Sequence, residues 1–392
     1  MIKYLEVVIY MTKVVLIKCD KYELEIIKNE LRKGFDLLGG LQNFIKKDDK
    51  VFIKLNCVGP FEADKAITTN PIFAWAVIQL VKEITNNIIV GDNPATRDLI
   101  YTLKKNGLYD VISSENLQIV DGRQSTKIYS ENYHIYNCFD VSKEMVDVDV
   151  LINLPKLKTH SLAYMTGAQK NLFGFIFGLN KASWHVKASN PLEFGEAIND
   201  LYGAILHTYK DKKILNIMDG IIGLEGEGPS TGGHPKKSNA ILISEDAVSL
   251  DRVALEVAGL DYKKMFINKI AGERGYGEND INKITILNNT IDDFKDIKYL
   301  PPKDSLGNFG LKFLRIKPIR NMLLEHPLVD RNICIKCGEC AKICPPKAMT
   351  IKKGEFPKLN STCCIRCWCC GEVCPQNAIK KSKRPFIGKI IF

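Results

Sequence analysis

The sequence predicts an α/β protein: a large domain with a mainly parallel sheet flanked by helices, plus a small α+β domain near the C-terminal end. Over residues 13–290, short β-branched runs alternate with longer amphipathic stretches, as expected for such a sheet and its helices. This pattern breaks at Pro301-Pro302, and ten of the 13 cysteines then follow between Cys334 and Cys374. With 392 residues, the chain is long enough for one large and one small domain.

The predicted strands of the large domain are short runs rich in valine, isoleucine and leucine. We expect them at residues 14–18, 51–55, 88–91, 117–120, 148–154, 214–218, 240–243 and 284–287. Helical periodicity lies between several of these runs, at residues 22–38, 71–85 and 247–258. Asn70 and Pro71 are the residue types of a helix N-cap and a first helical position. Ligands of parallel sheets bind beyond the carboxyl ends of the strands, so polar segments that follow strands are candidate sites.

Five polar segments lie near the ends of these runs and contain the residues of a candidate ligand pocket. These residues are Lys54, Asn56, Asp92, Lys156, Lys158, His160, Lys170, Asn171, Asp219 and Glu225. Converging lysines suit a carboxylate or phosphate ligand. Asp219 and Glu225 could hold a divalent metal or act as acid and base, and His160 could donate a proton or ligate a metal. Singly, each residue is a common surface charge or turn former, but together the segments predict a small anionic ligand.

The same segments resemble the domain-of-unknown-function 362 family over residues 14–260. The resemblance rests on the patterns Lys54-x-Asn56, Asp92-x-Pro94, Leu154-Pro-Lys-x-Lys-Thr-His160, Lys170-Asn171-Leu-x-Gly174, Asp219-Gly220 and Glu225-Gly-x-Gly-Pro229. It implies a fold, and a frequent junction with a two-cluster ferredoxin module, but no established reaction. Where the family pattern has Thr-His-Pro, this chain has Thr69-Asn70-Pro71, so a role for that histidine is not carried over.

Eight cysteines form two blocks of the pattern Cys-x2-Cys-x2-Cys-x3-Cys-Pro, and the second block repeats the first thirty residues later. Three cysteines on one tight loop can hold three corners of a [4Fe–4S] cluster, while the fourth ligates the other cluster. The predicted ligands of the first cluster are Cys334, Cys337, Cys340 and Cys374. Those of the second cluster are Cys344, Cys364, Cys367 and Cys370. A zinc ribbon needs two cysteine pairs rather than two quartets, and disulfides do not suit the compartment that we expect.

Residues 330–380 resemble the bacterial two-cluster ferredoxins, with every ligand position matched. The resemblance implies two short hairpins, two helices and one-electron transfer at low potential. Cys363 and Cys369 depart from the pattern, and we interpret both as small, semi-buried thiols, with a role as spare ligands as the alternative. Cys57 could face the candidate pocket, although an inert buried thiol is the simpler interpretation.

The predicted organisation is an α/β domain at residues 11–298, a linker at 299–327, a two-cluster domain at 328–382 and a basic, apolar tail at 383–392. Residues 331–392 hold 13 basic and 3 acidic residues, which accounts for the whole formal charge of +10. Two loaded clusters would lower the charge of this segment to about +6. An acidic redox partner is one interpretation, and simple compensation of the cluster charge is the other. We expect no nucleic acid partner, because no aromatic-interleaved basic motif is present.

The sequence also indicates a cellular location. No apolar run approaches the ~20 residues of a membrane span. Glu6 and Lys13 interrupt the apolar stretch at the start, which excludes a signal peptide. We therefore expect a cytoplasmic protein without a membrane span, whose true start is Met1 or Met11.

The leading functional hypothesis is an oxidoreductase that passes low-potential electrons through two [4Fe–4S] clusters to an anionic or metal-bound ligand in the α/β domain. One alternative is a non-enzymatic electron carrier whose large domain is a docking scaffold. The other alternative is a non-redox or metal-handling large domain with structural or sensing clusters. The leading hypothesis requires the lysine-rich segments to lie within electron-tunnelling reach of a cluster.

Overall fold

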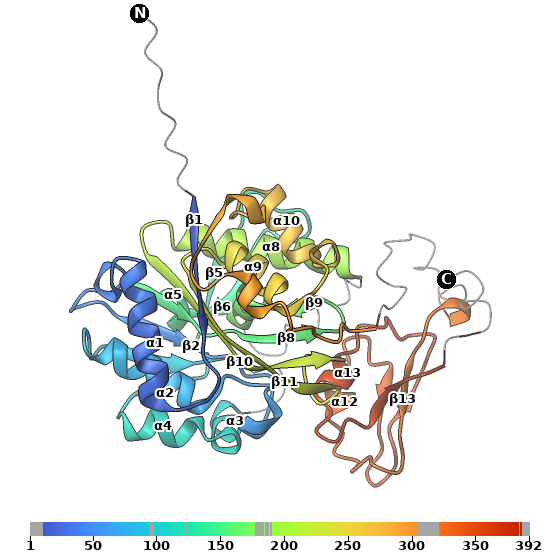
Figure 1. Ribbon diagram of the computed structural model, residues 1–392. Helices are drawn as coiled ribbons and strands as arrows, with labels where there is room; N and C mark the ends of the chain where they lie inside the picture. The colour runs from blue at the N-terminus through green and yellow to red at the C-terminus, as the bar shows by residue number, and fades with distance from the viewer. Residues whose placement is uncertain are drawn as a thin grey trace, which may run out of the picture.

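In the computed structural model, the described residues are 11–94, 98–122, 124–176, 184, 188, 190–303, 321–383 and 385. Within them, ten strands form one sheet in the order β12-β1-β11-β10-β7-β2-β3-β4, with β8 and β9 attached beside β10 (Figure 1). The bounds are β1 Thr12–Lys18, β2 Val51–Lys54, β3 Ile88–Gly91, β4 Gln118–Val120, β7 Val150–Asn153, β8 Lys156–His160, β9 Tyr164–Thr166, β10 Lys213–Gly226, β11 Gly233–Ser244 and β12 Ile284–Asn288. Parts of the predicted linker (304–320) and tail (384 and 386–392) lie outside the described residues.

The sheet is mainly parallel, as predicted, and each predicted strand coincides with one of its strands. The antiparallel pairings involve β11, which lies between β1 and β10, and the short β8–β9 hairpin. β10 and β11 are 14 and 12 residues long and extend well beyond the predicted runs. The added half of β11 is polar, and that of β10 is interrupted by three glycines, so a continuous apolar run did not mark either of them. A separate hairpin, β5 (Ser125–Tyr129) with β6 (Cys138–Ser142), was likewise not predicted.

Helices cover both faces of the sheet (Figure 1). One face packs against α1 (Leu24–Leu37), α2 (Pro71–Lys82), α3 (Leu99–Asn106) and α4 (Leu108–Ser114). The other packs against α8 (Pro191–Thr208), α9 (Ala247–Ala258) and α10 (Phe266–Glu273). In β1, Val15 and Ile17 join the core on the first face, whereas Val14 and Leu16 join the core on the second. Alternate residues of a strand point to opposite faces, so a sheet covered on both sides reads as a continuous apolar run.

The start of α2 confirms the predicted N-cap. The side chain of Asn70 accepts a hydrogen bond from the backbone N–H of Ile72, and Pro71 occupies the first helical position. Asn70 also places its own backbone N–H 3.0 Å from Asp219 Oδ2. The residue in the histidine position of the family pattern therefore starts a helix here.

The C-terminal module contains α12 (Glu339–Lys342), α13 (Cys369–Glu372) and four short strands. β14 (Met349–Thr350) and β15 (Lys358–Leu359) form a hairpin, while β13 (Pro327–Val329) pairs with β16 (Ile379–Lys381) from the opposite end of the module. The two helices agree with the ferredoxin resemblance, but one of the two expected hairpins is instead a pairing of the module's two ends. Among the described residues, no helix is long and apolar enough to cross a membrane.

The module lies against the tips of β8, β10 and β11 (Figure 1). Thr231, in the turn between β10 and β11, donates its hydroxyl to the carbonyl oxygen of Cys374 at 3.0 Å. Lys381 Nζ lies 2.5 Å from Glu227 Oε2. The long β10–β11 ribbon therefore positions the cysteine-rich module at the carboxyl edge of the parallel sheet.

A buried aspartate fixes the short helix α6 (Ala168–Asn171), which presents pocket residues. Asp251, on α9, accepts the backbone N–H groups of Ala168 at 2.6 Å and Gln169 at 3.1 Å. A Cβ on Gly167 would lie 2.0 Å from Asp251 Oδ1, so glycine is required for this close approach. Burial raises the pKa of Asp251 to about 7. The geometry of α6 therefore depends on a side chain more than eighty residues away in the sequence.

We expect Asp251→Ala to lower the free energy of unfolding by about 2–3 kcal/mol, because two buried N–H groups lose their acceptor. Denaturant unfolding measures this loss. Asp261→Ala is the matched control, because Asp261 accepts the backbone N–H of Lys263 in an exposed turn. Its loss should be about 1 kcal/mol or less. Equal losses for the two variants would contradict the anchoring role of Asp251.

Candidate functional site

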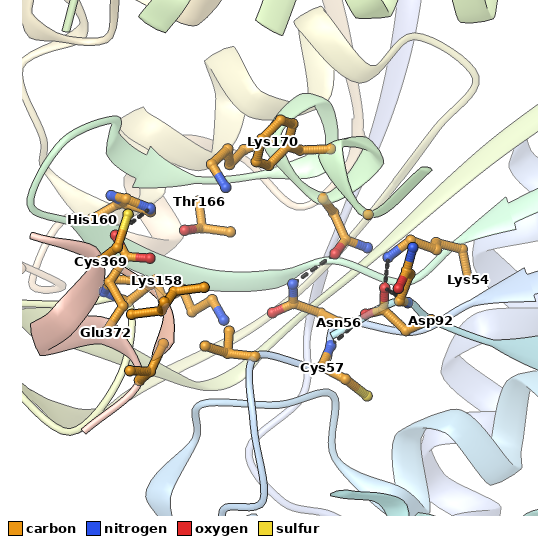
Figure 2. Close-up of a pocket in the computed structure, with 18 residues that line it drawn as sticks. Lys54, Asn56, Cys57, Asp92, Lys158, His160, Thr166, Lys170, Cys369 and Glu372 are labelled. Carbon is orange, nitrogen blue, oxygen red and sulfur yellow. Dashed lines mark hydrogen bonds and ion pairs between the residues drawn. The ribbon is translucent and has the colours of Figure 1, made fainter. Parts of the chain in front are cut away.

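A pocket of about 110 Å³ lies where the carboxyl ends of the strands meet the C-terminal module (Figure 2). The large domain contributes side chains that follow β2 and β3, side chains of β8 and β9, and residues of α6. The module contributes Ile343, Cys369, Glu372 and Val373. Seven of the predicted pocket residues line this space: Lys54, Asn56, Asp92, Lys158, His160, Lys170 and Asn171.

Lys54 and Asp92 form a buried ion pair on one wall of the pocket. Lys54 Nζ lies 2.7 Å from Asp92 Oδ1 and donates to the carbonyl oxygen of Leu55 at 2.8 Å. Asp92 Oδ2 also accepts the backbone N–H of Cys57 at 2.6 Å. A Cβ on Gly174 would lie 2.4 Å from Lys54 Nζ, so this glycine lets the backbone approach the pair. The positive charge of Lys54 is thus compensated by the protein itself.

Lys158 and Lys170 are the cations that remain for a ligand. Lys158 is fully buried, and its Nζ donates to the carbonyl oxygen of Ile67 at 2.6 Å. Lys170 Nζ lies 4.8 Å from the centroid of the Phe173 ring and 5.7 Å from that of Phe194. Neither lysine forms an ion pair with a carboxylate of the described residues. The pocket therefore presents positive charge in a space largely removed from water, as an anionic ligand requires.

Burial controls the protonation of both lysines. The pKa of Lys158 is lowered to about 7, chiefly by burial and next by the charges of Lys170 and Lys156, while Cys57 and Asp92 oppose the shift. Burial also lowers the pKa of Lys170, against the opposing charges of Glu372 and Cys369.

His160 and Glu372 meet across the boundary between the two domains. The backbone N–H groups of Leu162 and Ala163 donate to His160 Nδ1 at 3.0 and 3.2 Å. An Nδ1 that accepts hydrogen bonds carries no proton, so the proton of the ring is on Nε2. His160 Nε2 lies 3.7 Å from Glu372 Oε1. The imidazole N–H is therefore directed toward the pocket and the module.

Three predicted pocket residues lie elsewhere. Lys156 Nζ forms a buried ion pair with Asp219 Oδ2 at 2.7 Å and contacts the hydroxyl of Tyr22 at 2.8 Å. Asp219 lies opposite Lys156 in the register of β10 and β8, so it compensates the lysine locally. Glu225 Oε2 accepts the backbone N–H of Leu300 at 2.8 Å and so holds the start of the linker. The sequence grouped these three with the other seven residues, and the structure separates them.

The structure gives no support to the predicted divalent metal in the large domain. Asp219 and Glu225 bind protein groups instead of converging on one point. Within the described residues, no three side chains of histidine, cysteine, aspartate or glutamate gather closely enough to hold a single ion. The cysteine quartets are compatible with this finding, because a cubane separates its four sulfur ligands more widely than one ion does.

The eight predicted cluster ligands divide between two hollows in the module. Cys334, Cys337, Cys340 and Cys374 line the first hollow. The second hollow is lined by Cys344, Cys364, Cys367 and Cys370. A backbone N–H group approaches the fourth cysteine of each block, from Met349 to Cys344 Sγ at 3.3 Å and from Ala378 to Cys374 Sγ at 3.1 Å. Such N–H donors stabilise the thiolates of an iron–sulfur cluster, so the residues fit the crossed ligand sets that the duplication predicts.

Cys369 lines both the ligand pocket and the second cysteine hollow. It is buried, whereas Cys363, the other cysteine outside the ligand pattern, is exposed. Cys369 and Glu372 were not among the predicted pocket residues, because both lie far along the chain from the lysine-rich segments. Thr166 was also missed, since an isolated threonine gives no signal. Cys57 lines the pocket, as the sequence allowed.

Two family models and a curated protein of known sequence are similar to this chain. A model of the family described as domain of unknown function (DUF362) matches residues 51–256, and a 4Fe-4S binding domain model matches residues 326–349. The thylakoid-associated protein sll1697 of Synechocystis sp. is 34% identical over 247 residues, which is 63% of this chain and 74% of that protein.

Two solved structures show weaker similarity. The lactate racemase apoprotein of Thermoanaerobacterium thermosaccharolyticum has a TM-score of 0.38 and 17% identity, and the match covers 63% of this chain and 57% of that one. A protein of Thermotoga maritima has a TM-score of 0.37 and 12% identity, with coverage of 66% and 60%. The chain therefore spans less than two thirds of either solved protein.

We expect acetate, as an anionic probe, to bind less tightly as the pH rises through about 7, because Lys158 loses its charge there. The protein should also become more stable relative to Lys158→Met as the pH rises from about 7 toward the ordinary lysine pKa. Over this range the unfolded chain retains a proton that the native state has released. Calorimetric titration and denaturant unfolding across pH measure the two effects. If the free energies of unfolding of wild type and Lys158→Met changed in parallel with pH, the lowered pKa of Lys158 would be contradicted.

Proposed function

The chain belongs to the DUF362 family, and from the geometry of its pocket we propose that it is an iron–sulfur oxidoreductase that reduces a small anionic ligand. The 4Fe-4S binding domain at the C-terminal end supports the redox role. The pocket between the two domains would hold the electron acceptor. The substrate site would thus be in the large domain, and the electron source in the module.

The module would hold two [4Fe–4S] clusters, one in each cysteine hollow. When bound, each cluster supplies one-electron transfer. The first set of ligands would be Cys334, Cys337, Cys340 and Cys374, and the second Cys344, Cys364, Cys367 and Cys370. The fit of four cysteines to each hollow, with a backbone N–H on the fourth, supports this assignment.

The observation that carries the proposal is the wall shared by the pocket and the second cysteine hollow. Cys369 lines both spaces, and it lies between the cluster ligands Cys367 and Cys370 in the sequence. Ile343, which directly precedes Cys344, also lines the pocket. A ligand in the pocket would therefore be separated from the second cluster by about one layer of side chains. This arrangement supports electron delivery into the pocket rather than a large domain that serves as a scaffold.

The pocket residues would have distinct roles in this reaction. Lys158 and Lys170 would bind the negative charge of the ligand. Asn56 and Asn171 would form its neighbouring polar wall, joined by a hydrogen bond of 2.6 Å. His160 presents a proton on Nε2 at the boundary with the module, where reduction of a ligand would require one. Glu372 and Val373 of the module would close the pocket against water.

Electrons would come from an external redox protein. The module's segment, residues 331–392, holds 13 basic and 3 acidic residues, so an acidic surface is the partner that its charge favours. Such a partner would dock on the module. The cytoplasm remains our expected location.

Protein purified without oxygen should contain about eight iron atoms per chain, as two clusters require. Cys344→Ser and Cys374→Ser should each reduce the iron content, because each removes one ligand from a different cluster. Cys363→Ser is the matched control, since Cys363 is exposed and adjoins a ligand. Four or fewer irons in the wild type, or full iron content in both ligand variants, would contradict the assignment.

The reaction itself is tested by reducing the clusters without oxygen and screening small anions for reoxidation of the clusters, followed by absorbance. With an active anion, Lys170→Met should slow reoxidation about tenfold or more, because a charge-assisted contact is lost. Lys104→Met is the matched control, since Lys104 Nζ also lies over an aromatic ring, 4.7 Å from the Tyr109 centroid, but away from the pocket. Equal rates for the two variants would contradict the proposal. If no anion reoxidised the clusters, the non-enzymatic carrier would be favoured.

A further inference from the structure

Four buried asparagine side chains form a hydrogen-bonded ladder that ends at the pocket. Asn216 lies on β10, Asn153 ends β7, Asn171 ends α6, and Asn56 follows β2. Asn153 Nδ2 donates to Asn216 Oδ1 at 2.8 Å, and Asn171 Nδ2 donates to Asn153 Oδ1 at 2.7 Å. Asn56 Nδ2 then donates to Asn171 Oδ1 at 2.6 Å. The ladder crosses three strands at the carboxyl edge of the sheet.

Backbone carbonyl groups fix the direction of three of the four amides in the ladder. Asn216 Nδ2 donates to the carbonyl oxygens of Ser244 at 3.1 Å and Glu245 at 3.2 Å. Asn153 Nδ2 donates to that of Ala168 at 3.0 Å, and Asn171 Nδ2 to that of Leu55 at 3.3 Å. Carbonyl oxygens only accept, so none of these three amides can be turned round without losing its partner. Asn56 must therefore use its nitrogen inside the ladder.

As a consequence, the oxygen of Asn56 is a fixed acceptor that faces the pocket. Asn56 is 6% exposed, and its Oδ1 accepts no hydrogen bond from any described residue. In Figure 2 this oxygen points away from the dashed bond of the ladder and into the space between the labelled side chains. The hydroxyl of Thr166, which is 4% exposed and lines the same pocket, also has no partner among the described residues. Buried polar atoms without partners are costly, so a ligand is expected to satisfy them.

We propose that the pocket binds a small organic carboxylate that carries a hydroxyl or N–H donor. Lys158 and Lys170 would bind its carboxylate, and its donor would reach Asn56 Oδ1 and the Thr166 hydroxyl. The same two lysines exclude a metal cation as the partner of these oxygens. A singly charged carboxylate is favoured over a phosphate ester, because Lys54 is compensated by Asp92 and Glu372 adds a carboxylate to the lining. This inference rests on the proposed function in one respect: it uses the same pocket as the ligand site, and it does not require the redox reaction.

The test measures binding to the oxidised, cluster-loaded protein with no electron donor present. The probes are matched pairs that differ in one hydroxyl, glycolate with acetate and 3-hydroxybutyrate with butyrate, together with methyl phosphate. The hydroxylated member of each pair should bind about fivefold more tightly or better, as a hydrogen bond to an otherwise unsatisfied acceptor predicts. Equal binding within both pairs, tighter binding of methyl phosphate, or no binding by any probe would overturn the proposal.

Thr166→Val removes the hydroxyl while keeping the shape of the side chain. The preference for hydroxylated probes should fall about threefold or more, while the stability of the protein without a probe should stay the same or increase, because no hydrogen bond is lost. Ser130→Ala is the matched control, since Ser130 Oγ is also buried without a partner but does not line the pocket. An unchanged preference in Thr166→Val would overturn the assignment.

The outcomes separate this inference from the proposed function. If hydroxylated carboxylates bind selectively but no anion reoxidises the clusters, the binding site stands and the oxidoreductase proposal fails. If an anion without a donor group reoxidises the clusters, and the members of each matched pair bind equally, the oxidoreductase proposal stands and the hydroxylated-carboxylate site fails.

Discussion

Three lysines of this protein, Lys54, Lys156 and Lys158, are almost fully buried at the carboxyl edge of one sheet, and the low-dielectric interior requires that each be compensated. Lys54 is paired with Asp92 and Lys156 with Asp219, so two of the charges are balanced within the protein. Lys158 donates to the carbonyl oxygen of Ile67, and no carboxylate of the described residues lies at ion-pair distance from it. Lys54 and Lys156 are therefore neutralised by carboxylates of the protein, whereas the positive charge of Lys158 is available to a ligand. The other pocket residues surround this lysine.

The fold brings the lysine-rich strand ends and the cysteine-rich module together at the carboxyl edge of the sheet. Parallel strands place their polar ends side by side, and the long β10–β11 ribbon holds the cysteine-rich module over the same edge. One wall of the pocket is thus polar and cationic, and the other is formed by residues that adjoin cysteine ligands. A pocket between the two domains is shielded from water, positively charged and adjacent to a cysteine hollow at once, and neither domain alone provides all three.

Much of this could be predicted from residue types and spacing. The ligand sets of the two clusters could be predicted from the cysteine blocks alone. A repeat of thirty residues with fixed internal spacing is compatible with few ligand arrangements besides two [4Fe–4S] clusters. The strands were readable because a sheet covered on both faces needs continuous apolar runs, as Val14 to Ile17 show. The N-cap at Asn70 was readable because it depends on the next two residues alone. Each of these is a local property of the chain.

The sequence by itself therefore determined the fold class, the family segments and the two cysteine quartets. Only the tertiary structure decided which cations are available, since the partner of Lys156 is set by the register between β8 and β10, sixty-three residues apart. It alone brought Cys369 and Glu372 to the pocket, and it alone fixed the direction of the Asn56 amide through three other asparagines. Pairing and orientation of this kind depend on contacts between distant segments, and spacing along the chain does not encode them.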